Sequence, residues 1–100
     1  MKHYQGTRSG TAALVTVDGR PLNPRLDLWN HSPTGLEWGY GGSGPAQLAL
    51  ALLADALGDD DAALRWHQDY KSDVVAGLPY KGWALTDEAI QTTITALASE

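Results

Sequence analysis

The chain has 100 residues, room for one domain of ordinary size, and its 43% hydrophobic and 19% charged residues are typical of a globular protein rather than a disordered one. The absence of cysteine excludes disulfides, thiolate metal sites and a cysteine nucleophile, and the net charge of −5 argues against a protein that binds nucleic acid by neutralising phosphates. The longest apolar run, residues 46–57, is too short to span a membrane, and the polar start of the chain predicts a cytoplasmic protein without a secretory signal.

The first 40 residues alternate between β-branched runs and turn residues, which predicts short strands. We expect three of them at residues 3–8, 13–17 and 20–22. Asp18-Gly19, between the second and the third, is typical of a type I′ hairpin turn, because both positions of that turn need positive φ. Pro21 has no backbone N–H, so the third strand must be short and lie at an edge of the sheet.

A loop and one more strand complete the first part of the chain. Residues 23–35 are rich in proline, asparagine and serine and predict a long ordered loop. A short strand over residues 36–40 is expected to close the sheet.

The remaining residues are rich in alanine and leucine and predict three helices. The first is expected to run from Pro45, at the first helical position, to Leu57, with Gly44 as N-cap and Gly58 as left-handed C-cap. Gln47 would then reach back to the N–H of the cap residue. Leucines surround most of this helix, which indicates that it is central and buried on most sides.

Two further helices follow in the sequence. Three consecutive aspartates, residues 59–61, predict the start of the second, because carboxylates cap free N–H groups and oppose the positive end of the helix dipole. This helix is expected to end at residues 77–79, and the third is expected to begin at Thr86.

These elements predict a single α+β domain over residues 1–100, in which a small antiparallel sheet packs on three C-terminal helices. Residues 1–40 should be mainly strands and loop, and residues 45–100 mainly helices. The charge follows the same division, with +1 over residues 1–40 and −6 over residues 41–100. A basic partner would therefore meet the helices.

The segment Gly39-Tyr40-Gly41-Gly42-Ser43-Gly44 matches the pattern G-x-G-x-x-G before an expected helix. A Rossmann unit does not fit, because a second helix follows where a parallel strand is needed, and no Lys-Ser/Thr pair marks a P-loop. Two interpretations stay open. The glycines either allow a sharp connection against packed aromatic rings, or they form an anion site with the free N–H groups at the start of the helix.

Two groups of polar residues carry residue types found in known active sites. Asp27, His31 and Ser32 could compose a hydrolytic triad, but residues so close in sequence rarely adopt that geometry, so a turn is the simpler interpretation. His67 has Lys71 at the i+4 position, where a metal site on a helix needs a ligand. We therefore expect His67 to be partly exposed, and we expect no metal, no cofactor and no catalytic residue.

The aromatic residues are unusual, because the chain has four Trp and four Tyr but no Phe. Nearly every large ring therefore carries a polar tip, which favours interfaces and ligand pockets. Trp29, Trp38 and Tyr40 lie close together in sequence near the glycine segment. They form either the edge of the core or a binding surface.

Several motifs resemble an uncharacterised family of small prokaryotic domains found in bacterial, archaeal and phage or plasmid genomes. The motifs are residues 17–22, 30–35, 38–49, 57–59 and 82–86, so the resemblance covers nearly the whole chain. It implies a domain of unknown function with no catalytic residues to transfer. The association with mobile elements implies a small accessory protein that binds a host component.

We expect a non-enzymatic protein-binding module, an accessory protein of a phage or mobile element that binds or inhibits a host defence complex, with a host complex or a second copy as its partner. The alternative is a small-ligand or nucleotide-binding domain that binds an anion at the glycine-rich loop. Such a domain could also have weak hydrolase activity. No direct nucleic-acid or membrane binding is expected. The candidate binding residues are Arg25, Trp29, Asn30, His31, Ser32, Glu37, Trp38, Tyr40, Gly41, Gly42, Ser43 and Gly44.

Overall fold

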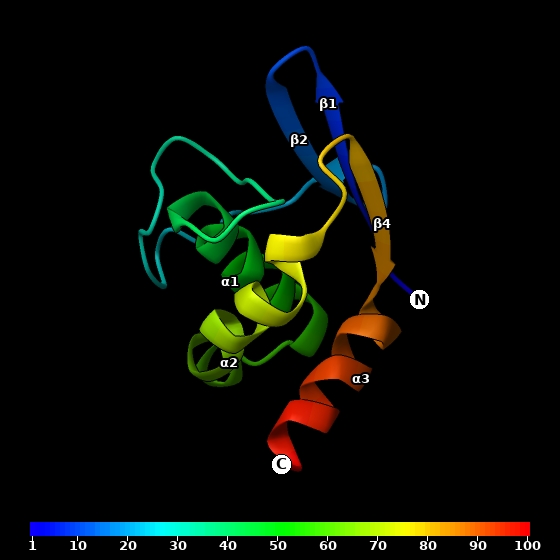
Figure 1. Cartoon of the computed structure of the whole chain (residues 1–100). Coiled ribbons are helices and arrows are strands. Elements are labelled where there is room, and N and C mark those ends of the chain that lie inside the picture. Colours follow the sequence, from blue (N-terminus) through cyan, green and yellow to red (C-terminus); the bar gives the residue numbers. More distant parts are fainter.

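The computed structural model describes all 100 residues and shows an α+β fold, as the sequence predicts (Figure 1). The strands are β1 (His3–Ser9), β2 (Ala12–Val17), β3 (Arg20–Pro21) and β4 (Gly82–Thr86). The helices are α1 (Ser43–Leu57), α2 (Asp60–Asp73) and α3 (Asp87–Ala98), with a short 3₁₀ turn, η1 (Val75–Gly77), after α2. None of these helices combines the length and the apolar character that crossing a membrane requires.

The four strands form one antiparallel sheet in the order β3-β2-β1-β4. The β2–β3 turn has φ of 49° at Asp18 and 81° at Gly19, which confirms the predicted type I′ geometry. The strand that contains Pro21 has two residues and lies at the edge of the sheet, also as predicted.

The prediction of a strand at residues 36–40 is wrong, and the fourth strand is β4, which precedes the last helix. Gly39 has a φ of 88°, which interrupts an extended chain, and the Trp38 side chain is fully buried in the core. β4 instead pairs with the free edge of β1, where Trp83 lies opposite Gly6. The sheet therefore joins the two ends of the domain (Figure 1).

α1 is the central helix, with 12 of its 15 residues buried, which confirms the prediction made from its leucines. It packs most extensively on α2 and also contacts α3 and η1. Its N-cap is Gly42 rather than Gly44, so Pro45 occupies the third helical position instead of the first. Proline is tolerated there too, because the N–H groups of the first turn have no partner within the helix.

The caps of the other helices follow the sequence. Asp59 accepts a hydrogen bond from the N–H of Ala62 at 3.1 Å, and Thr86 Oγ1 accepts one from the N–H of Ala89 at 3.1 Å. α2 is shorter than predicted. It ends at Asp73, and the 3₁₀ turn covers most of the remaining expected range.

Candidate functional site

The loop between β3 and α1 carries most of the predicted site residues, and a buried glutamine fixes it. Gln47 is fully buried on α1, and its Oε1 accepts hydrogen bonds from the N–H groups of His31 at 2.8 Å and Ser32 at 3.2 Å. Its Nε2 donates to the carbonyl of Pro24 at 2.6 Å. The prediction that Gln47 caps its own helix is therefore wrong. Its amide instead holds the loop against α1 at two places, Pro24 near the start of the loop and His31-Ser32 near its middle.

Arg25 fixes the start of the same loop. Its φ is 56°, and its N–H donates to Oδ1 of Asn23 at 2.9 Å. Its guanidinium binds two carboxylates, those of Asp27 (3.1 Å) and Asp60 (2.9 Å). These contacts raise the pKa of Arg25, with Asp60 the larger cause, and Arg25 lowers the pKa of Asp27. The guanidinium is thus committed to joining the loop to the start of α2.

Trp29 and His31 lie at the tip of the loop, against α2. The Trp29 ring is 59% exposed and stacks on the His31 ring, with centroids 5.6 Å apart and planes 23° apart. An open pocket of about 490 Å³ lies beside them, which we call the Trp29 pocket. It is lined by Leu28, Trp29, His31, Leu64, His67 and Gln68.

A pair of histidines connects this loop to α2. Nε2 of His31 and Nε2 of His67 are 2.9 Å apart, and Nδ1 of His67 lies 2.8 Å from the carbonyl of Leu64. A carbonyl can only accept, so His67 carries its proton on Nδ1 and, when neutral, accepts the Nε2–H of His31. Burial lowers the pKa of His31, and the positive charges of His67 and Lys71 lower it further. His67 is 6% exposed, so the prediction of a partly exposed residue is wrong.

A second cluster surrounds Arg8 of β1, whose side chain is only 6% exposed. The guanidinium lies between the rings of Trp38 and Tyr80, at 4.2 Å and 3.8 Å from their centroids. It donates to both carboxylate oxygens of Glu37, at 2.7 and 3.2 Å. Arg8 thereby lowers the pKa of Glu37, and β1 is joined to the segment that precedes α1.

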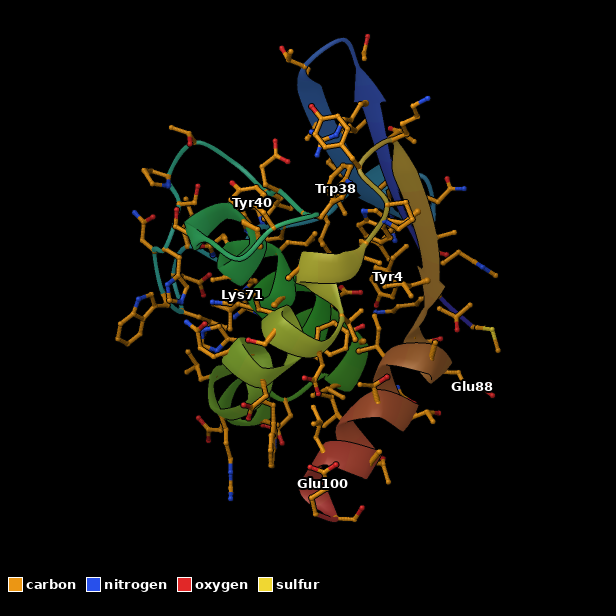
Figure 2. The ribbon with its side chains drawn as sticks, viewed as in Figure 1. Tyr4, Trp38, Tyr40, Lys71, Glu88 and Glu100 are labelled. Atoms are coloured by element: carbon orange, nitrogen blue, oxygen red, sulfur yellow. The ribbon has the colours of Figure 1, made fainter.

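The glycine segment turns tightly around the Tyr40 ring. A Cβ on Gly42 would lie 2.7 Å from that ring, and a Cβ on Gly44 would lie 2.8 Å from Cβ of Glu37. Figure 2 shows Trp38 between the sheet and the helices and Tyr40 beside the start of α1. The glycines therefore permit the close packing that one of the two interpretations predicts.

The same segment also borders a pocket of about 440 Å³ at the start of α1, which we call the α1 pocket. Its lining includes the polar side chains of Thr11, Ser32, Thr34, Glu37, Tyr40 and Ser43, together with Gly35 and Gly44. Ser32 is only 8% exposed. The pocket brings residues of the β1–β2 turn, the loop and α1 together.

The predicted site residues thus fall into two pockets, and some belong to neither. Trp38 has no exposed surface and serves the core, so its assignment to a binding surface is wrong. Arg25 is held by carboxylates, and Asn30 and Gly41 are exposed but line neither pocket. Gly42 is the N-cap of α1.

The residue types of a hydrolytic triad do not come together. His31 faces His67 and Asp27 faces Arg25, whereas a triad requires the histidine to bond both the aspartate and the serine.

Residues 4–96 match a family described as Family of unknown function (DUF6166). The chain belongs to this family. The comparison with curated proteins and the comparison with solved structures gave no match. The function of this DUF6166 member must therefore be argued from its own residues.

The sequence did not predict the roles of three residues that organise the two pockets of this DUF6166 domain, Gln47, His67 and Arg8. Gln47 was detectable in principle, because a glutamine inside an apolar helix must find partners when it is buried. His67 gave a weaker signal, through its helical spacing from Leu64. Arg8 gave none, since its partners Glu37 and Tyr80 are distant in sequence.

Proposed function

We propose that the chain is a non-enzymatic protein-binding module whose contact surface is centred on the Trp29 pocket. The observation that carries the proposal is an exposed tryptophan that is fixed before any partner arrives. Trp29 is 59% exposed, yet its stacking partner His31 is hydrogen-bonded both to His67 and, through its N–H, to Gln47. Tryptophans beside apolar pockets dominate the energy of many protein interfaces, and prior ordering reduces the entropy cost of binding.

The surroundings of the pocket favour a basic partner. Asp60 lies one helical turn before Leu64, which lines the pocket, and Asp59 and Asp61 flank it. Arg25 is bound to Asp60 of this group and to Asp27 of the loop. The rim at the start of α2 is therefore acidic, and such a rim accelerates association with a positively charged surface. This agrees with the negative charge of the helical part of the chain.

The wider proposal places the module in the cytoplasm, as an accessory protein of a phage or mobile element that binds or inhibits a host defence complex. It rests on the family resemblance in the sequence. A second copy of the chain is the alternative partner. The Trp29 pocket and its acidic rim are the surface that either partner would contact.

The test is site-specific photocrosslinking of the full chain in cells of its natural host. A photoreactive residue replaces Gln68 in the Trp29 pocket, and the control replaces Leu14, which is 52% exposed on β2. We expect a crosslinked product from position 68 and none from position 14, and mass spectrometry then distinguishes a host protein from a second copy. Trp29→Ala should weaken capture by about 30-fold or more.

The same variant supplies the control for folding. Because Trp29 is largely exposed, Trp29→Ala should keep the helical circular dichroism of the wild-type chain. Equal crosslinking at positions 68 and 14, or capture that persists in the folded Trp29→Ala variant, would overturn the proposal.

A further inference from the structure

We infer that the α1 pocket is a separate binding site for phosphate or for the phosphoryl group of a small molecule. The first observation is the start of α1 itself. Gly42, the N-cap, supplies no side-chain cap, the first turn contains no acidic residue, and the first helical hydrogen bond runs from the N–H of Ala46 to the carbonyl of Gly42 at 3.0 Å. The N–H groups of Ser43 and Gly44 are left without an acceptor at the positive end of a 15-residue helix.

The second observation is independent of the helix and concerns Ser32. Its N–H is bonded to Gln47, but its hydroxyl makes no hydrogen bond within the protein, although only 8% of the residue is exposed. Ser32 lines the α1 pocket, so its hydroxyl is available there. The hydroxyl must therefore take its partner from outside the chain, and a ligand in the pocket would replace water there.

The balance of donors and acceptors selects the class of ligand. Hydroxyl groups of Thr11, Thr34, Tyr40 and Ser43 add to those already described. Glu37 is the one carboxylate among the lining residues, and both of its oxygens accept from the guanidinium of Arg8. The two N–H groups can only donate, each hydroxyl can donate as well as accept, and the one carboxylate is already paired. The lining therefore fits a ligand rich in acceptors, such as a phosphoryl group.

The size of the pocket extends the inference beyond a bare ion. Its volume of about 440 Å³ lies within the range of about 300–1,000 Å³ that is typical of small-molecule sites. The Tyr40 ring, 52% exposed, lines the same pocket and offers a flat face to an attached group. Free phosphate and a phosphomonoester would make the same hydrogen bonds at the start of α1. Only the phosphomonoester has an attached group that could also contact the Tyr40 ring.

The experiment is a titration of the ¹⁵N-labelled full chain at constant ionic strength, followed by the backbone amide signals. The probes are inorganic phosphate, AMP and adenosine, with sodium chloride as the salt control. We expect phosphate and AMP to shift the signals of Ser32, Ser43 and Gly44, and adenosine and chloride to leave them in place. Tighter binding of AMP than of phosphate identifies a phosphomonoester site, and equal binding identifies a site for the free anion.

Two variants test the named donors, and a third is the matched control. Ser32→Ala and Ser43→Pro should each weaken phosphate binding about tenfold or more, since each removes a donor to a charged ligand. Proline suits the first helical position, and Gly42 before it is already extended. If the proline variant does not fold, Ser43→Ala replaces it in the test; this variant removes the hydroxyl of residue 43 and keeps the N–H. Thr92→Ala removes a hydroxyl from α3, outside the pocket, and should leave the affinity unchanged.

Three results would overturn the inference. The first is an absence of shifts at Ser32, Ser43 and Gly44 at about 50 mM phosphate, a concentration far above the millimolar dissociation constants of weak sites. The second is that adenosine shifts these signals as much as phosphate does. The third is an unchanged affinity for phosphate in folded Ser32→Ala and Ser43→Ala. None of these results bears on the Trp29 pocket, so the two proposals are tested separately.

Discussion

Gly6 and Trp83 determine how closely β4 packs against β1. They lie opposite each other in the register, and a Cβ on Gly6 would lie 2.3 Å from Nε1 of Trp83. The indole N–H is buried without a hydrogen-bond partner, so the packing of the ring alone holds it. Trp83 in turn meets Trp38 edge to face, with ring centroids 5.6 Å apart. A single methyl group at position 6 would therefore disturb the contact between the sheet and the core.

Gly6→Ala should lower the free energy of unfolding by about 2–3 kcal/mol, the cost of overpacking a well-filled core. Gly77→Ala is the matched control, because Gly77 has no atom near its Cβ position and no positive φ, and it should change stability by less than about 1 kcal/mol. Urea unfolding at neutral pH measures both. Similar values for the two variants would show that the Trp83 ring moves aside without cost.

At the scale of elements, Gln47 connects α1 to the loop that carries Trp29 and Ser32. Gln47→Ala leaves the N–H groups of His31 and Ser32 and the carbonyl of Pro24 without their partners. Because each unpaired buried group costs about 1–3 kcal/mol, we expect a loss of stability of about 3 kcal/mol. Urea unfolding measures the loss, and proteolysis within the loop should become faster than in the wild-type chain.

Gln91→Ala is the control for this prediction. Gln91 is an exposed glutamine on α3 that donates a single hydrogen bond to the carbonyl of Ala56 at 2.9 Å. Its loss should cost about 1 kcal/mol or less and leave proteolysis of the loop unchanged. If Gln47→Ala proves no more harmful than Gln91→Ala, the loop is held by its other contacts.

The elements that local chemistry determines could be predicted from the sequence, and those that depend on distant partners could not. The Asp18-Gly19 turn, the edge strand with Pro21 and the central leucine-rich helix require only neighbouring residues to be understood. Residues 36–40 and 82–86 are both short and aromatic. The choice between them depends on which one fits opposite Gly6 and which one supplies the buried Trp38.

The candidate site follows the same division. The sequence drew attention to the loop and the glycine segment, because prolines, glycines and aromatic residues concentrate there, and residues of both segments line the two pockets. It could not show that His31 meets His67 or that Glu37 meets Arg8, since these pairs are 36 and 29 residues apart. Nor could it show that the region forms two pockets rather than one. The position of the loop between the pockets depends on its hydrogen bonds to the side chain of Gln47.

At the scale of the whole molecule, these contacts make stability depend on pH in two ranges. The pKa of His31 is lowered in the folded state, so as the pH falls below about 6.5 the unfolded chain takes up a proton that the folded chain resists. The pKa values of Glu37 and Asp27 are also lowered, so their contribution is present above their ordinary values and is lost as the pH falls below about 4.5. The free energy of unfolding should therefore decrease as the pH is lowered through each of the two ranges.

His31→Gln should remove the first decline and keep the second. Glutamine at position 31 cannot titrate, and its side-chain amide can still donate to Nε2 of His67. The measurement is the free energy of unfolding in urea at a series of pH values from 7.5 down to about 3.5. His3→Gln, at an exposed position on β1, is the matched control and should follow the wild-type curve. General changes in repulsion, as the net charge of −5 is titrated, act on all three chains, so the difference between the curves isolates His31. A wild-type curve that is flat between pH 7 and 5, or a His31→Gln curve parallel to it, would mean that the folded and unfolded chains bind the His31 proton equally well.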